Sequence, residues 1–151
     1  MLTDNFMYRV PAPQIPMFWD AIKFTCSKAD NIEEEFYSAY FNELLQALLS
    51  DKAQCFVVLS NERVLQRVII TRIVQDKLRK DTELVIQCMY SITKASYEDV
   101  QKHFALAMSV ARSLGCKRLT WKSSNPKIWE WAQMVGCFEQ TRVFSVSVGG
   151  V

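Results

Sequence analysis

The chain has 151 residues, 50% hydrophobic and 23% charged, which predicts one globular domain over residues 1–151 that buries a core of its own. No window approaches the ~18 apolar residues of a membrane span, and the first residues lack a signal-peptide pattern, so we expect a cytoplasmic protein that is not secreted and has no membrane contact. The net charge is +2, but seven acids and three bases give residues 1–50 a charge of −4, which leaves +6 for residues 51–151.

Cysteine and histidine usage argues against a metal site and a disulfide framework. The five cysteines are an odd number, form no C-x-x-C pair and lie among apolar neighbours: Cys26, Cys55, Cys88, Cys116 and Cys137. We therefore predict reduced thiols in the core and no zinc site. His103 is the only histidine, which excludes a site with several histidine ligands, and its place inside a helical segment favours a structural role.

The first third of the chain is predicted as a strand followed by two helices. Residues 6–10 alternate in polarity and stop at Pro11, which cannot continue a strand ladder, so we predict an edge strand. Apolar residues recur every four positions from 17 to 28, and a second periodic run covers 32–50. Asn31 is a suitable N-cap for this second helix.

The second helix has an unusually wide apolar arc. Two adjacent rows at i, i+4 spacing are apolar, and one of them contains Tyr37, Phe41 and Leu45. This arc is wider than the roughly 100° stripe of a helix that covers one core. Either the helix lies between the sheet and the first helix, or a partner covers it. We predict that Tyr37, Phe41 and Leu45 lie at an interface with a protein partner or with a second copy of the chain.

The middle of the chain predicts a three-stranded antiparallel meander. Segments rich in β-branched residues at 55–60, 64–74 and 84–92 are joined by short polar connections. The second connection carries three bases: Lys77, Arg79 and Lys80. Such a cluster fits either a solvated hairpin tip or a nucleic-acid contact. Because the other bases are scattered along the chain, we favour the hairpin tip and expect no nucleic-acid binding.

The last third predicts a helix, a strand, a second helix and a closing strand. The four segments cover residues 97–114, 118–122, 126–135 and 138–148. Gly115 and Gly136 follow the two helices, where a residue with left-handed backbone often ends a helix. The predicted order is therefore β α α β β β α β α β, an α/β (α+β) fold with a mixed sheet.

The spacing of residues in this last third resembles the acyl-CoA-binding half of the GNAT (N-acetyltransferase) superfamily. Members commonly carry Asn, an alanine-like residue, an aromatic residue and Gly-Phe at fixed offsets, and those positions here are Asn125, Ile128, Ala132, Gly136 and Cys137. Ala111 and Gly115 match the A-x-x-x-G that ends the preceding helix. The resemblance implies a mainly antiparallel mixed sheet flanked by about four helices.

The resemblance breaks at the loop that holds the acyl-CoA pyrophosphate in GNAT enzymes. That loop needs glycines, because its backbone N–H groups must approach the phosphates closely. Here the two glycine positions fall on Glu98 and Val100, and the arginine position falls near Ala95. Ser96 and Asp99 also form a capping-box pattern, which satisfies the helix N-terminus internally. The sequence therefore predicts a degenerate site that binds no cofactor.

Residues for acid–base catalysis are also missing from the positions that the resemblance implies. The tyrosine that protonates the leaving thiolate is replaced by Ala132, and Glu83, a candidate base, is predicted to lie at the surface. We therefore interpret the chain as a non-catalytic structural or interaction protein, of the kind found in phage or prophage virions. The alternative is an acyl-CoA-dependent N-acetyltransferase with an atypical loop, for which acetyl-CoA would be the acyl donor.

Overall fold

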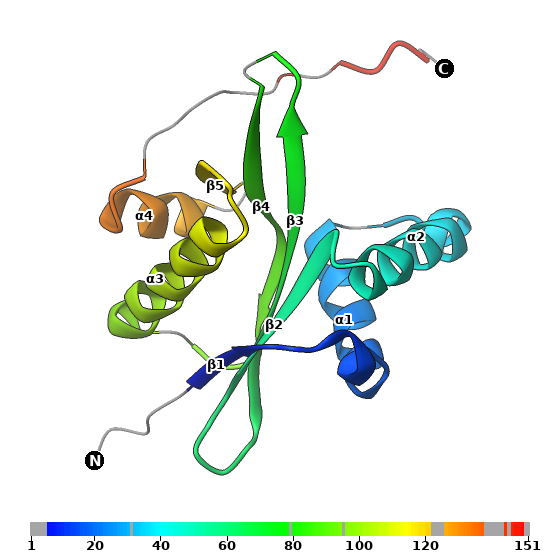
Figure 1. Cartoon of the computed structure of the whole chain (residues 1–151). Coiled ribbons are helices and arrows are strands. Elements are labelled where there is room, and N and C mark those ends of the chain that lie inside the picture. Colours follow the sequence, from blue (N-terminus) through cyan, green and yellow to red (C-terminus); the bar gives the residue numbers. More distant parts are fainter. Residues whose placement is uncertain are drawn as a thin grey trace.

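The structure is a computed structural model that describes residues 6–30, 32–78, 80–94, 96–121, 126–137, 144 and 146–149. Among these residues a five-stranded sheet forms the centre, with helices on both faces (Figure 1). The strands, in their order across the sheet, are β1 (Phe6–Arg9), β2 (Ala53–Leu59), β3 (Leu65–Asp76), β4 (Asp81–Ser91) and β5 (Arg118–Trp121). The first four pair antiparallel, and β5 pairs parallel with β4.

Four α-helices in the described part of the chain cover the two faces of the sheet. Helices α1 (Ile15–Asp30) and α2 (Tyr37–Leu49) lie on one face, and α3 (Tyr97–Ser113) and α4 (Pro126–Met134) lie on the other (Figure 1). Single 3-10 turns at Ala12–Gln14 and Glu34–Phe36 precede the first two helices. This order confirms the predicted mixed α/β fold. None of these helices has the length and hydrophobicity needed to cross a lipid bilayer.

Some of the predicted features fall outside the described residues. The closing strand predicted over 138–148 is described only at Phe144 and 146–148, and these residues are not in a strand. Four single positions used in the sequence analysis also lie outside: Asn31, Arg79, Ala95 and Asn125. The residue before α2 is Phe36, which makes no side-chain cap, so the prediction that Asn31 caps this helix is wrong: the helix begins several residues later, after a 3-10 turn. The part of the GNAT spacing that rests on Asn125 stays a prediction.

The larger core lies between the sheet and the helix pair α1 and α2. Ile22 of α1 and Leu44 of α2 are fully buried, and they pack in one cluster with Val57 and Ile70 of the central strands. These side chains share one face because apolar residues recur at helical spacing in the helices and alternate in the strands. Full burial of an aliphatic side chain of this size stabilises the fold by roughly 1.5–3 kcal/mol.

Helix α3 is positioned by local signals at both of its ends. Ser96 Oγ accepts a hydrogen bond from the backbone N–H of Asp99 (3.1 Å), as the capping pattern predicts. Gly115 takes a φ of 74°, and the backbone N–H of Cys116 donates to the carbonyl of Ala111 (2.9 Å). The helix ends there, and the chain turns back into β5, which lies beside α3 (Figure 1).

An irregularity in β4 changes which side chains face each helix pair. Ile70 lies opposite Cys88 but Thr71 lies opposite Ile86, so Gln87 is an extra residue in β4, a β-bulge. Ile86 packs on the α3 side, whereas Gln87 and Cys88 both contact side chains of the α1–α2 side. The bulge therefore presents two consecutive side chains to α1 and α2, where a regular strand would present one.

The predicted interface residues of α2 differ in their surroundings. Phe41 is 8% exposed and packs edge-on against the rings of Trp19, Tyr37 and Tyr40. Tyr37 is 38% exposed, and Leu45 is half-buried against the core. Phe41 therefore fits the alternative in which the helix is covered by the sheet and α1, because its ring is buried and contacts Trp19 of α1. An interface through Tyr37, Phe41 and Leu45 stays a prediction, in which Tyr37 supplies most of the accessible surface.

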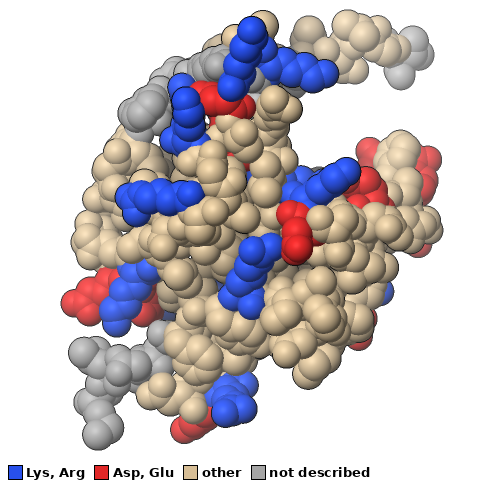
Figure 2. Space-filling view, viewed as in Figure 1, with Lys and Arg blue, Asp and Glu red and all other residues tan. Residues whose placement is uncertain are grey.

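The described basic residues form no single cluster on the face drawn in Figure 2. On the face drawn in Figure 2, most Lys and Arg side chains are separated by uncharged and acidic residues. Lys77 and Lys80 are exposed at the connection between β3 and β4. This placement is typical of a hairpin tip, and the absence of nucleic-acid binding stays a prediction.

Candidate functional site

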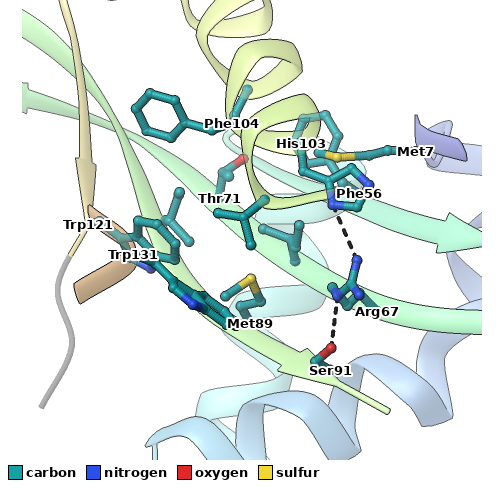
Figure 3. Close-up of a pocket in the computed structure, with 14 residues that line it drawn as sticks. Met7, Phe56, Arg67, Thr71, Met89, Ser91, His103, Phe104, Trp121 and Trp131 are labelled. Atoms are coloured by element: carbon teal, nitrogen blue, oxygen red, sulfur yellow. Dashed lines mark hydrogen bonds between the residues drawn. The ribbon is translucent and has the colours of Figure 1, made fainter. Parts of the chain in front are cut away.

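A partly open cavity of about 40 Å³ lies between the sheet and helices α3 and α4 (Figure 3). Its walls are almost entirely apolar and come from all five described strands and from both helices. Phe56 and Ile69 line it from the sheet, and Phe104 and Ala107 line it from α3. A space of this size holds about three water molecules.

Arg67 and His103 form the polar end of the cavity (Figure 3). Arg67 is 2% exposed, and it donates from Nε to Ser91 Oγ (2.8 Å) and from Nη1 to His103 Nδ1 (3.3 Å). Because Nδ1 accepts this hydrogen bond, a neutral His103 carries its proton on Nε2. Burial, followed by the positive charge of Arg67, lowers the pKa of His103 to about 4. His103 is therefore neutral at physiological pH.

The other end of the cavity lies where β5 stops beside β4. The parallel pairing ends at Ile86 and Trp121, whereas β4 continues to Ser91. Beyond the bulge, the edge of β4 that faces away from β3 therefore has no described strand beside it. Trp121, at the end of β5, and Trp131 of α4 both line the cavity near this edge (Figure 3). This edge, which is open among the described residues, presents backbone N–H and C=O groups that can pair with an extended ligand as they would with a strand.

A chain of polar side chains lies on the opposite face of the sheet, at the β4 bulge. The Gln87 amide donates to the Tyr40 hydroxyl of α2 (2.7 Å) and accepts from Arg72 Nε. Arg72 also holds Glu43 of α2 by two hydrogen bonds, Nη1 to Oε1 at 2.8 Å and Nη2 to Oε2 at 2.5 Å. This contact lowers the pKa of Glu43 and raises the pKa of Arg72. Sequence reasoning misses the group, because strand register alone brings Arg72 and Gln87 to α2.

The two positions considered for acid–base chemistry do not line the cavity. Glu83 is buried at 9% exposure and accepts a hydrogen bond from the Thr120 hydroxyl of β5 (3.2 Å), so the prediction that it lies at the surface is wrong. The reason is that β5 pairs with this end of β4 and covers it. Ala132 is half-buried on α4 and has no group that transfers a proton.

The N-terminus of α3 offers little to a pyrophosphate. Ser96 Oγ already accepts from the Asp99 N–H, and Glu98 and Asp99 place two carboxylates in the first turn. Each carboxylate would repel a nearby anion by about 1 kcal/mol or more. Lys94 and Lys102 are exposed bases close by in the sequence. The degenerate phosphate loop stays a prediction, because Ala95 lies outside the described residues.

Cysteines gather in the core between α1 and the sheet. The sulfur atoms of Cys26 on α1 and Cys88 on β4 lie 3.1 Å apart, and none of the five cysteines is in a disulfide. Burial raises the pKa of Cys55 to about 12, with Cys26 as a second cause. Since the thiolate is the reactive form, Cys55 is a poor nucleophile in the folded state, and Cys26 and Cys88 are shielded from reagents by burial.

We expect the four buried thiols to react slowly with N-ethylmaleimide, and Cys137, which is half-buried, to react first. Mass spectrometry of the native protein over time, with a denatured sample as the fully reactive control, measures the order of labelling. Labelling of Cys26, Cys55 or Cys88 as fast as that of Cys137 would contradict the packing of this core.

Solved structures with the same arrangement of elements establish what the fold is. No family model matches the sequence, and no curated protein is similar to it. A GNAT family acetyltransferase from Staphylococcus aureus superposes with a TM-score of 0.64 at 11% identity, over 97% of this chain and 100% of that one. The aminoglycoside N-acetyltransferase AAC(6')-Iy in complex with CoA reaches a TM-score of 0.72 at 14% identity, over 97% and 96%. The chain has the GNAT fold.

A third structure with the GNAT fold is a predicted acetyltransferase with acetyl-CoA from Clostridium acetobutylicum. It superposes with a TM-score of 0.71 at 9% identity, over 96% of this chain and 97% of that one. Identities of this size show the fold alone, so an activity needs support from the residues of this chain.

The interpretation of the chain as a non-catalytic structural protein is contradicted by these similarities. Solved structures that share the GNAT fold with it are mostly acetyltransferases, which favours the alternative, an acyl-CoA-dependent N-acetyltransferase. The prediction of no cofactor is not confirmed either, because structures with this fold contain CoA or acetyl-CoA. The non-catalytic interpretation depends on residues that are missing from the GNAT motif positions, and such absences do not exclude an enzyme whose site uses other residues.

Proposed function

We propose that the protein is an acyl-CoA-dependent N-acetyltransferase, which transfers an acetyl group from acetyl-CoA to a primary amine. The observation that carries the proposal is the open edge of β4 at and beyond the bulge at Gln87. The apolar cavity adjoins this part of β4 on the α3 side, and the Tyr40 hydroxyl adjoins it on the α2 side. A donor and an acceptor can therefore approach the same part of the strand from opposite faces of the sheet.

The open edge of β4 suits the arm of acetyl-CoA. The pantetheine arm contains two amides, and an unpaired strand edge supplies N–H and C=O groups that bind amides as a neighbouring strand would. Met89, Trp121 and Trp131 supply apolar surface beside the edge (Figure 3). Water is excluded by such a surface, and hydrogen bonds to the thioester carbonyl are stronger there than in bulk water.

The pyrophosphate end of acetyl-CoA fits this chain less well than the arm does. Glu98 and Asp99 oppose an anion at the start of α3, and Lys94 and Lys102 only partly offset them. We therefore expect most of the binding free energy to come from the acyl-pantetheine part, and the overall affinity for acetyl-CoA to be weak.

The reaction needs a neutral amine and a proton for the leaving thiolate. The amine nitrogen attacks the thioester carbonyl, the C–S bond breaks, the amine proton passes to solvent, and the CoA sulfur takes a proton. Tyr40 is the candidate donor of that proton, because its hydroxyl lies at the bulge and accepts a hydrogen bond from Gln87. Glu43 is held ionised by Arg72 and is not available as an acid.

We expect the acceptor to be a cationic amine. Residues 1–50, which include α1 and α2, carry seven acids and three bases, a net charge of −4. Several of the similar solved structures are aminoglycoside acetyltransferases. Aminoglycosides and linear polyamines therefore form the first acceptor panel.

Acetyl-CoA at up to millimolar concentration is expected to raise the melting temperature, and addition of a suitable amine is expected to release free CoA thiol. S-acetylpantetheine, which lacks the adenosine and pyrophosphate groups, should raise the melting temperature by nearly as much. Thermal unfolding with both donors and a thiol assay with the amine panel measure these effects. The absence of any shift with either donor, together with no thiol release, would overturn the proposal.

The variant Tyr40→Phe tests the role given to its hydroxyl. It is expected to lower kcat by about 10²–10⁴-fold, because the leaving thiolate loses its proton donor, while the melting temperature changes little. Tyr37→Phe is the matched control, since it removes the same group from a neighbouring residue of the helix that is 38% exposed. Equal loss of activity in both variants would argue against a specific role of Tyr40.

A further inference from the structure

The cavity under α3 contains a buried positive charge that no described residue neutralises. Arg67 is 2% exposed, and its two hydrogen-bond partners, Ser91 and His103, carry no charge at neutral pH. Its Nη2 atom is buried and has no hydrogen-bond partner among the described residues. No ion pair joins Arg67 to any carboxylate of the described residues. A buried charge without a counter-charge is costly, which indicates that something else satisfies it.

The charged groups near Arg67 do not remove this excess of positive charge. Asp99 of α3 raises the pKa of Arg67, but its effect is smaller than that of burial, which lowers it. Lys102, also on α3, acts in the opposite direction to Asp99 on His103. The polar end of the cavity therefore keeps a net positive character.

Water alone is a poor occupant of this cavity. A volume of about 40 Å³ accommodates about three water molecules, and each of them needs two to four polar partners. Besides Arg67 and the indole N–H groups of Trp121 and Trp131 at the far end, the polar side chains of the lining are Thr71, Ser91 and His103, and Thr71 Oγ1 already donates to Gln54 Oε1 (2.8 Å). A ligand that is anionic at one end and apolar at the other satisfies both Arg67 and the rest of the walls.

We propose that this cavity binds a free short-chain carboxylate, such as propionate or butyrate, with the carboxylate on Arg67 and the hydrocarbon chain against Phe56, Met89 and Phe104. The planar guanidinium presents its N–H groups in a fork that matches a carboxylate. The small volume excludes a long acyl chain, and Arg67 lies at the end of the cavity away from Trp121 and Trp131 (Figure 3). This site does not depend on the acetyltransferase proposal, and its test uses no acyl-CoA.

Thermal unfolding and isothermal titration with sodium propionate, butyrate and hexanoate test the site at constant ionic strength. Butyrate is expected to raise the melting temperature saturably by a few degrees. Sodium chloride and 1-butanol, which lack the carboxylate, should have no saturable effect, and hexanoate should bind more weakly than butyrate because it is too long. The proposal is overturned if butyrate has no effect on the wild type, or if 1-butanol matches it.

Two variants connect the effect to Arg67. Arg67→Met should abolish the response to butyrate, and without ligand it should melt at the same or a higher temperature, since it removes an unpaired buried charge. Arg112→Met is the matched control, because Arg112 is an exposed arginine of α3 that does not line the cavity, so this variant should keep the full response. If Arg67→Met does not fold, Arg67→Lys keeps the charge but loses the fork and should bind butyrate roughly tenfold more weakly. A butyrate affinity unchanged in the folded Arg67 variant would overturn the proposal.

Discussion

Replacing Phe41 by glutamate is expected to unfold the protein. Phe41 is 8% exposed and packs among Trp19, Tyr37 and Tyr40, so the substitution removes a buried ring and leaves a carboxylate without a partner. Loss of a buried phenylalanine alone costs about 3–5 kcal/mol, and the unpaired charge adds to it. A domain has only about 5–15 kcal/mol of stability to lose. Circular dichroism of Phe41→Glu should show loss of the helical signal and of the cooperative melting transition.

Tyr37→Glu is the matched control for that substitution. It introduces the same charge one helical turn away, at a side chain that is 38% exposed, and the protein should stay folded. Light scattering on this variant also tests the predicted interface, because a charge there should dissociate an oligomer. A monomeric wild type would reject self-association through α2, and a folded Phe41→Glu variant with a wild-type melting temperature would show that Phe41 is not in the core.

The stability of the fold is expected to fall as the pH drops from 6.5 towards 4, because of His103. Its pKa is about 4 in the folded protein and 6.5 as an ordinary histidine, so between these values the unfolded chain binds a proton that the folded chain does not. The contribution of His103 is therefore fully present above pH 6.5 and is lost as the pH falls towards 4. The charged groups that face the ring are Arg67, Asp99 and Lys102, and Arg67 opposes protonation most strongly among them.

Denaturant unfolding at a series of pH values measures this dependence, with His103→Gln as the comparison. Carboxylates whose pKa is lowered in the folded state, such as Glu43, also lose stabilising interactions in acid. This loss of stability is the same in the wild type and in His103→Gln, so it cancels in the comparison. The slope of stability against pH should therefore be steeper in the wild type than in His103→Gln. Since His103 is the only histidine, its pKa is also measurable by NMR without ambiguity. Identical slopes, or an NMR pKa near 6.5, would contradict its placement beside Arg67.

Local signals explain why the elements of this fold were predictable from the sequence. Ser96 caps α3 through its own side chain, and Gly115 ends that helix with a left-handed φ, both within a few residues of the chain. Apolar periodicity of 3.6 or 2 likewise depends only on neighbouring residues, and it predicts α1 and the meander to within a few residues of their observed bounds, whereas α2 begins later than predicted, after a 3-10 turn. The order of elements then resembled the GNAT fold, and the solved structures confirm that fold.

Tertiary structure decided the features that give the candidate site its chemistry. The bulge at Gln87 is a property of the register between β3 and β4, and the register brings Gln87 to Tyr40 across 47 residues of sequence. The sequence shows Arg67 only as a polar residue in a predicted strand. In the folded protein α3 packs over it, buries it and places His103 beside it. The sequence alone determined local backbone conformation, because hydrogen bonds and dihedral preferences act between near neighbours. Burial, register and the pairing of charges depend on segments far apart in the chain, so only the folded structure shows them.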